Sequence, residues 1–372
     1  MPFQLREMTQ AMLRGLNFGA GPATLPLPIL EEAQAGLLNW QGSGLSIMEM
    51  GHRTAAFMGF MQEAEALLCG LLNIPDSHQV LFLGGAARLH FAMVPMNFIP
   101  EGQTAGYLET GIWSSMAYQE ALRLKQAYSI ASSQDGGFLT VPSEEEWRIE
   151  AGFAYCYYTP NETINGVRCH MPPVKGVPLV ADMTSCLLAE PVNVADYGLI
   201  FAGAQKNIAN AGLTIVIVKK SWLESIDDTK LPRMLDYRWQ AQHQSLYATP
   251  PTFNCYLALK MFQWIGQQGG VNALYEKNQA KAQMLYDYID ASSFYQCPVA
   301  GAARSLFNVC FRAPTADWDL AFVEKAEATG LLGLKGHKVV GGLRASLYNA
   351  MPLQGVEKLI LFMEEFAMSA TK

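Results

Sequence analysis

Short apolar runs that end in a polar residue or a glycine turn recur along this chain, and stretches of helical spacing separate them. Five runs predict buried strands: 80–83, 153–158, 177–181, the run that follows Gly198, and 213–218. Strands that alternate with helices are typical of an α/β fold, in which helices flank a mostly parallel sheet. We therefore predict an α/β protein with such a sheet as its largest unit.

Apolar residues at helical spacing predict helices on both sides of these strands. The segments are 28–38, 58–72, 86–96, 252–267, 272–290 and a helix that Asp317 would cap and Gly330 would end. The character of the chain changes after Pro250–Pro251, where predicted helices dominate. We expect a large domain over 17–265 and a smaller α+β domain over 266–372.

Composition narrows the classes of protein that fit this pattern. Of the 372 residues, 50% are hydrophobic and 16% charged, which is typical of a large buried core and not of disorder. The net charge of −7 leaves no basic patch for nucleic acid, and we expect no membrane-spanning helix. Seven scattered cysteines without a Cys-x-x-Cys pair favour a cytoplasmic protein with reduced thiols. The six histidines lack the spacing of a metal site.

Lys206 stands where one predicted strand gives way to a loop, and Asp182 stands at the end of another. An amine held among apolar neighbours has a lowered pKa and can attack a carbonyl carbon. A carboxylate at a strand end can keep the nitrogen of a heteroaromatic ring protonated. Taken singly, each residue is better explained as one that caps a surface loop, so neither identifies a site by itself.

Three further features could serve the same ligand. Gly84–Ala87 follows a strand and opens a helix, where free backbone N–H groups and the helix dipole bind phosphate. Trp113 can stack on a flat ring, and Thr163 can donate a hydrogen bond to a ring oxygen. Each has an ordinary alternative: a tight turn, a buried aromatic or a turn hydroxyl. Together with Asp182 and Lys206 they are the groups that a pyridoxal phosphate site requires.

Basic side chains form a second set that could bind an anionic substrate. His52 and Arg53 are adjacent, Arg88 follows the glycine turn, and His337 and Arg344 lie near each other in a later segment. Arginine forks bind carboxylate and phosphate, and several converging arginines would select a dianionic substrate. For any single one of these residues, a solvated or ion-paired surface role is the better explanation.

Longer motifs carry a resemblance to a known family. They are Asn17–Pro22, Ser46–Arg53, Pro160–Gly166, Ala202–Ile208, Thr249–Phe253 and Leu334–Met351. From about Asn17 to Met363 the chain resembles the phosphoserine aminotransferase family, which belongs to the class V, fold-type I enzymes that use pyridoxal phosphate. The resemblance implies a seven-stranded-type sheet in a large cofactor-binding domain. It also implies that residues 1–25 join the small domain or a dimer interface.

The same resemblance implies roles for single residues. Lys206 would form the Schiff base with pyridoxal phosphate and move the proton, Asp182 would pair with the ring nitrogen, and Trp113 would stack on the ring. Thr163 would hydrogen-bond the ring oxygen. The cofactor phosphate would lie among Ala87, Arg88, Gln205 and, from the partner subunit of a homodimer, Thr249 next to Ala248. The substrate would be held by His52, Arg53, Arg88, His337 and Arg344.

The implied reaction is a reversible ping-pong transfer of the amino group between glutamate and 3-phosphohydroxypyruvate in serine biosynthesis. A phosphohydroxythreonine step in pyridoxine biosynthesis is a further role. Two alternatives stay open: a class V aminotransferase for a neutral substrate, and a homologue that binds the cofactor with little turnover. Departures from the family pattern motivate the second alternative. Leu89 and His90 would put bulk and a titratable ring beside Arg88, and Ala248 replaces a common asparagine.

Overall fold

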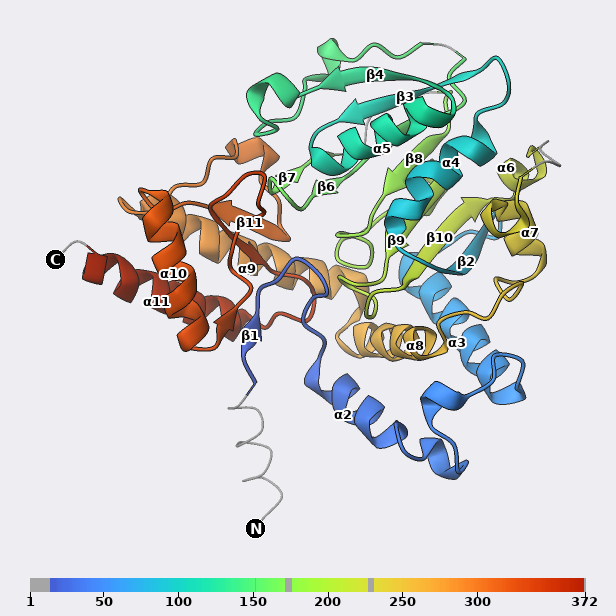
Figure 1. The fold of residues 1–372 in the computed structure, drawn as a ribbon, viewed down its shortest axis with the longest axis horizontal. Helices are drawn as coiled ribbons and strands as arrows, with labels where there is room; N and C mark the ends of the chain where they lie inside the picture. The colour runs from blue at the N-terminus through green and yellow to red at the C-terminus, as the bar shows by residue number, and fades with distance from the viewer. Residues whose placement is uncertain (1–13, 151, 171–175, 227–230, 371–372) are drawn as a thin grey trace.

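The computed structural model describes residues 14–150, 152–170, 176–226 and 231–370, and a seven-stranded sheet forms its centre (Figure 1). The strand order is β2-β10-β9-β8-β5-β3-β4, and every neighbouring pair is parallel except the two that β10 forms. The strands are β2 His78–Gly84, β3 Thr104–Glu109, β4 Gln126–Ser132, β5 Cys156–Tyr158, β8 Leu179–Asp182, β9 Leu199–Gly203 and β10 Leu213–Lys219. The mostly parallel sheet confirms the predicted fold class.

Helices cover both faces of this sheet because its strands bury alternate side chains in two separate cores. Val80 and Phe82 of β2 pack in the core on one face, together with α3 and α8. Leu81 and Leu83 pack in the other core, together with α4, α5 and α7. The helices are α2 Leu27–Gly36, α3 Ala55–Leu72, α4 His90–Phe98, α5 Ile112–Leu124, α6 Lys220–Glu224, α7 Tyr237–Gln242 and α8 Thr252–Gln267.

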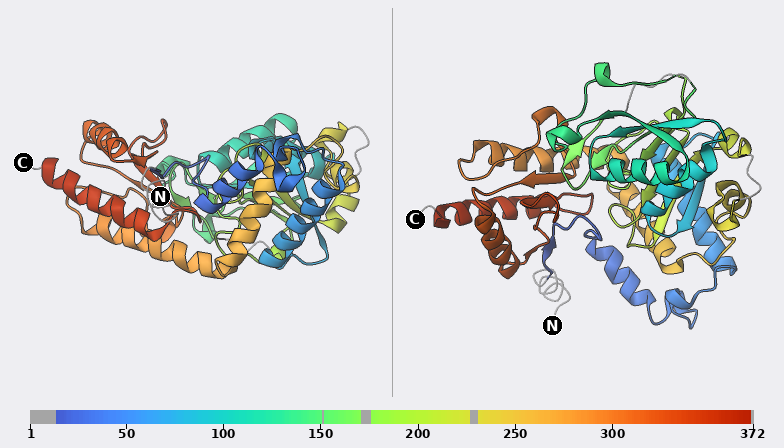
Figure 2. Two further views of the ribbon diagram at one scale, coloured as in Figure 1. Left: turned by 90° about the horizontal axis from the view of Figure 1, so that it is seen from below. Right: turned by 45° about the horizontal axis from the view of Figure 1, so that its top comes forward.

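A second group of elements lies beside the sheet (Figures 1 and 2). The strands β11 (Asn308–Phe311) and β13 (Leu343–Ser346) pair antiparallel, and β1 (Leu16–Asn17) pairs parallel with β12 (Leu331–Leu332). The helices of this group are α9 Gly270–Ala291, α10 Ala316–Ala328 and α11 Leu353–Ala370. Leu274 of α9 packs in a core of the sheet, whereas Leu285 and Ile289 pack in the core of this second group. Helix α9 therefore connects the two.

Several element boundaries differ from the sequence prediction. The strand expected at 153–158 is regular only over Cys156–Tyr158, and the helix expected from 86 begins with a 3₁₀ turn at Ala87–Leu89. Asp317 does not cap α10. Thr315 does, because its backbone is extended just before the helix and its hydroxyl accepts the N–H of Trp318 at 3.4 Å. The elements that were not predicted include β3, β4, α5, α7 and α11, and the strands β11 and β13 of the second group.

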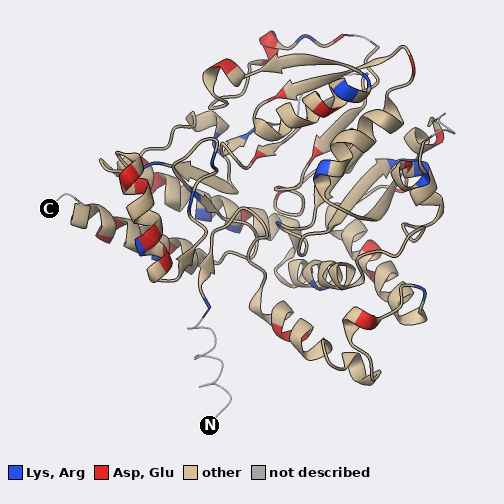
Figure 3. Ribbon diagram, in the orientation of Figure 1, with Lys and Arg blue, Asp and Glu red and all other residues tan. Residues whose placement is uncertain are grey.

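Within the described residues one helix, α3, is long and apolar enough to cross a membrane by length and composition alone. Its side chains Phe57, Ala64 and Leu68 are buried in the core beside the sheet. Figure 3 shows charges of both signs interspersed over the outer helices and loops, with the sheet largely free of them. All seven cysteines are free thiols.

Candidate active site

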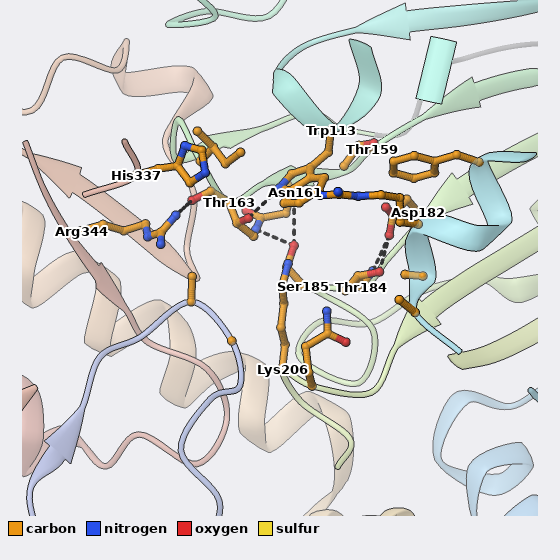
Figure 4. A pocket seen from close by; sticks show the side chains of 18 residues that line it. Trp113, Thr159, Asn161, Thr163, Asp182, Thr184, Ser185, Lys206, His337 and Arg344 are labelled. Atoms are coloured by element: carbon orange, nitrogen blue, oxygen red, sulfur yellow. Dashed lines mark hydrogen bonds between the residues drawn. The ribbon is translucent and has the colours of Figure 1, made fainter. Parts of the chain in front are cut away.

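A cavity of about 430 Å³ opens where several strands of the sheet end, between the sheet and the second group of elements (Figure 4). The carboxyl ends of parallel strands are the usual place for a ligand in an α/β sheet. Nine residues that the sequence singled out line it: Ala87, Arg88, Trp113, Thr163, Asp182, Gln205, Lys206, His337 and Arg344. The fold thus brings together residues from distant parts of the chain.

Lys206 lies three residues beyond the end of β9 (203 to 206), as the apolar run predicts, and its side chain is only 9% exposed. Burial lowers the pKa of its amine to about 8, because the charged form loses its hydration. The negative charge of Asp182 opposes this shift, and the positive charge of Arg344 reinforces it. Lys206 is therefore a lysine that is partly uncharged near neutral pH.

Asp182 ends β8 and is held there by Thr184. Its Oδ1 accepts hydrogen bonds from the Thr184 N–H at 2.9 Å and from the Thr184 hydroxyl at 2.5 Å. The same hydroxyl accepts the N–H of Gly203 at 3.1 Å, which ties the end of β8 to the end of β9. Burial raises the pKa of the Asp182 carboxyl above its usual range, and the bonds from Thr184 and the charge of Lys206 oppose that rise.

Trp113 lies in the first turn of α5, and Thr163 lies in the short turn after β6 (Asn161–Glu162). The indole N–H of Trp113 donates to the Thr163 hydroxyl at 2.9 Å. The guanidinium of Arg88 lies 5.2 Å from the centre of the Trp113 ring, which is within the range of a cation–π contact. In Figure 4, Trp113 lies above the cavity and Lys206 rises from the opposite side. A flat ligand between them would meet both.

The turn at Ala86–Arg88 presents backbone N–H groups to the cavity. Within the described residues, the N–H groups of Ala87 and Arg88 have no hydrogen-bond acceptor. His90, by contrast, is not beside the cavity. Its ring is buried, stacks on Phe201, and shares a 2.6 Å hydrogen bond with the Tyr237 hydroxyl. Burial lowers its pKa to about 3, so the expected titratable ring beside the phosphate turn is absent there.

Basic groups gather at the opposite end of the cavity. Arg344 of β13 donates from Nη1 to the carbonyl of Thr163 at 2.9 Å, and its buried Nε has no partner among the described residues. His337 lies in the turn before β13, and its pKa is lowered, first by burial and then by the charges of Arg344 and Lys338. An unpaired buried guanidinium nitrogen is costly unless a ligand satisfies it. This end of the cavity therefore suits an anion.

Four residues that the sequence singled out do not line this cavity in a single chain. His52 is half-buried and Arg53 is exposed, just before α3. Ala248 and Thr249 are exposed before α8. Their position leaves them available to a second copy of the chain.

The cavity also contains residues that the sequence analysis did not single out. They are Ala20, Gly21, Phe91, Thr159, Asn161, Ile164, Thr184 and Ser185, whereas Ala86, which also lines the cavity, belongs to the predicted phosphate turn Gly84–Ala87. Thr184 had a local signal, because a threonine two positions after an aspartate can bond back to that carboxylate. Asn161 and Ile164 belong to the quoted motif Pro160–Gly166, although no role was assigned to them.

These residues fit pyridoxal phosphate on the chemistry of their groups. Unpaired N–H groups at Ala87 and Arg88 suit its phosphate, and the buried carboxylate of Asp182 suits its ring nitrogen. The amine of Lys206, with its lowered pKa, suits its aldehyde. A volume of about 430 Å³ also lies within the range of small-molecule sites. Among the described residues, no group of three or more His, Cys, Asp or Glu side chains is arranged as metal ligands.

Comparison with known proteins decides the family. The model of the class-V aminotransferases matches residues 16–359. The chain belongs to the class-V aminotransferase family. The phosphoserine aminotransferase of Legionella pneumophila is 56% identical over 355 residues, which cover 95% of this chain and 98% of that protein. The phosphoserine aminotransferase of Listeria monocytogenes is 48% identical over 358 residues, which cover 96% and 97%.

Solved structures of the family agree with this assignment. The phosphoserine aminotransferase of Bacillus circulans subsp. alkalophilus superposes with a TM-score of 0.93 at 43% identity, over 96% of this chain and 99% of that one. The pyridoxal phosphate-bound phosphoserine aminotransferase of Trichomonas vaginalis superposes with a TM-score of 0.91 at 38% identity, over 94% and 100%. The family resemblance and the enzyme class expected from the sequence are both confirmed.

Proposed function

We propose that this chain is a phosphoserine aminotransferase that uses pyridoxal phosphate. It transfers the amino group reversibly between glutamate and 3-phosphohydroxypyruvate, giving O-phospho-L-serine and 2-oxoglutarate. The observation that carries the proposal is one cavity in which Lys206 and Asp182 lie beside the phosphate turn and Arg344 and His337 lie at the other end. Relatives that are 46–56% identical over nearly the whole chain bear the same name.

Bound pyridoxal phosphate supplies an electron-withdrawing ring that stabilises negative charge at the α carbon of the substrate. Asp182 holds the proton on the ring nitrogen, and Thr184 fixes its carboxylate for that task. Trp113 covers one face of the ring, and the N–H groups of Ala87 and Arg88 bind the phosphate, joined by Gln205. Thr163 holds the indole of Trp113 and presents its hydroxyl to the ring oxygen.

Lys206 has two tasks that depend on its setting. Its uncharged amine would hold the cofactor through the aldehyde group, with release of water, and Nζ would take the proton that leaves the α carbon of the substrate. A base works best when its pKa is close to the working pH, and burial brings the pKa of Lys206 to about 8. By comparison, the side chain of an ordinary surface lysine is almost fully protonated at neutral pH.

Arg344 and His337 explain why both substrates fit one pocket. Phosphoserine and glutamate each carry an α-carboxylate and a second anionic group. Arg344 lines the cavity and would bind the α-carboxylate through its guanidinium. His337 and Arg88 bind the distal phosphate or carboxylate. This concentration of basic groups favours a dianionic substrate over serine or alanine.

We further propose that two chains share their active sites in a homodimer. His52, Arg53 and Thr249 would reach the cavity of the partner, because all three lie outside the cavity of their own chain. Large apolar side chains are also exposed in the segment between α2 and α3, with Leu38 89% and Met48 59% exposed. Apolar side chains of this size are typical of a subunit interface. We also propose the domain division at residues 265–266, near the end of α8, which assigns His337 and Arg344 to the smaller domain and Lys206 to the larger one.

A donor comparison tests the function. Purified protein loaded with pyridoxal phosphate is mixed with 2-oxoglutarate and either phosphoserine or serine, and glutamate is measured. Two charge-assisted contacts to the phosphate are worth about 1.5–3 kcal/mol each, so we expect phosphoserine to react roughly a thousandfold faster in kcat/KM. Lys206→Ala is the inactive control. Equal rates for the two donors would assign the chain to a neutral substrate, and no glutamate from either would refute an aminotransferase.

A further inference from the structure

Glu162 is a completely buried carboxylate that the mechanism above does not use. It lies on β6, one residue before Thr163, and its side chain reaches across to the first turn of α5. Its Oε2 accepts the backbone N–H of Trp113 at 3.0 Å, and its Oε1 accepts the backbone N–H of Ser114 at 2.8 Å. Among the described residues it forms no ion pair. Its hydrogen-bond partners are therefore two N–H groups in the first turn of α5, which have no acceptor within the helix.

Helix α5 needs this external carboxylate because its own cap has no side chain. The residue before the helix is Gly111, in an extended backbone, and it has no side-chain oxygen of the kind that Ser, Thr, Asp or Asn supplies to the first N–H groups of a helix. A Cβ atom at Gly111 would lie 2.4 Å from Glu162 Cγ and Cδ, so the carboxylate occupies the space that a capping side chain would fill. Glu162 thus substitutes for the missing cap and benefits from the helix dipole.

The cap also fixes Trp113. Its backbone N–H is held by Glu162, and its indole N–H is held by the adjacent Thr163 at 2.9 Å. The carbonyl of Thr163 in turn accepts Arg344 at 2.9 Å. Glu162 and Thr163 therefore hold Trp113 at its backbone and at its indole ring. Thr163 also connects it to Arg344 at the other end of the cavity.

We propose that Glu162 is a positioning residue: by capping α5 at Trp113 and Ser114, it holds the indole ring against the bound cofactor. This inference rests on the proposed function only in that it requires pyridoxal phosphate to bind. Burial raises the pKa of Glu162 to about 7 against the opposing hydrogen bonds from α5. Burial therefore makes the ionised form of Glu162 costly, and such a carboxylate is more typical of a functional position than of a helix cap at the surface.

A double-mutant cycle separates positioning from simple capping. The variants are Glu162→Gln, Trp113→Ala and the double variant, each loaded with pyridoxal phosphate, and the measurement is the rate of cofactor loss into a trap. Glutamine keeps the volume and one acceptor oxygen, but its NH2 group then faces the second of the two backbone N–H donors. We expect Glu162→Gln to speed cofactor loss about tenfold when Trp113 is present and less than twofold when it is replaced by alanine, because the ring to be positioned is then gone.

The matched control is Glu109→Gln. Glu109 is also a buried carboxylate that contacts α5, where it accepts the Ser115 hydroxyl at 2.8 Å, but no hydrogen bond joins it to Trp113. We expect this variant to keep the wild-type rate of cofactor loss. Urea unfolding of the apoproteins reports the capping role alone, which should be equal with and without the indole ring.

Two outcomes overturn the proposal. If Glu162→Gln speeds cofactor loss equally with Trp113 in place and in the Trp113→Ala variant, Glu162 is a stabilising cap only. If Glu162→Gln loses the cofactor at the wild-type rate, Glu162 has no role in cofactor binding, even through Trp113. If Glu162→Gln does not fold, Glu162→Asp retracts the carboxylate by one methylene, and the same cycle and criteria apply. A wild-type protein that binds pyridoxal phosphate but shows no phosphoserine activity would refute the proposed function and leave this cycle readable.

Discussion

The lowered pKa of Lys206 determines how fast the apoprotein captures its cofactor, since only an uncharged amine attacks an aldehyde. With a pKa of about 8, about a quarter of the Lys206 side chains are uncharged at pH of about 7.5, against about one in a thousand for an ordinary lysine. We therefore expect the fraction of reactive amine alone to make capture roughly 200-fold faster than capture by a free lysine side chain.

The assay is stopped-flow absorbance of the apoprotein mixed with pyridoxal phosphate across a series of pH values. The cofactor itself also titrates, so N-acetyl-lysine amide is measured in the same buffers, and its rate per uncharged amine divides out that contribution. The corrected rate of the protein should rise with pH and level off above about 8, whereas the model amine continues to gain up to about 10.5.

Asp182→Asn gives the second arm of this experiment. The charge of Asp182 raises the pKa of Lys206, so its removal should move the midpoint of the corrected curve to lower pH. Asp196→Asn, which removes an exposed carboxylate elsewhere, is the matched control and should leave the midpoint in place. A wild-type midpoint near 10 would refute burial as the cause of a lowered pKa, and a midpoint that moves upward in Asp182→Asn would refute the opposing effect of the Asp182 charge.

Two further predictions concern the assembly and the core. If Arg53 serves the partner's site, a mixed dimer of one Lys206→Ala chain and one Arg53→Ala chain contains one intact site. Random reassortment of the two variants should therefore restore activity to about a quarter of wild type. No recovery of activity would mean that Arg53 serves the site of its own chain. Lys281 donates to the buried carbonyls of Leu347, Tyr348 and Met351 at 2.9–3.0 Å, so Lys281→Met should lower the free energy of urea unfolding by about 3 kcal/mol. The exposed Lys277→Met should change it by less than about 0.5 kcal/mol, and a similar loss in both variants would contradict the role of these three bonds.

The sequence could predict the positions of Lys206 and Asp182 because each follows a short buried strand. β8 and β9 are buried on both faces, so they read as continuous apolar runs whose ends are visible. β4 gave no such signal, because it lies at the sheet edge and mixes exposed and buried positions. The apolar pattern of β3 is interrupted by Gly106, a position where a side chain does not fit because its Cβ would lie 2.6 Å from Ile130. Helix α11 buries Val356, Leu359 and Met363 at helical spacing, so its signal was present in the sequence.

The roles of Glu162 and His90 could not be predicted, because both depend on contacts across the fold. Glu162 caps a helix that begins 50 residues earlier in the chain (112 to 162), so no local pattern links it to Gly111. His90 follows Arg88 closely, yet the direction of the helix turns its ring toward Tyr237 of α7. Proximity in sequence suggested an effect on the phosphate that the backbone geometry removes. The residues that hold the catalytic groups in place are therefore determined by contacts across the fold. The catalytic groups themselves lie at strand ends, which the sequence pattern predicts.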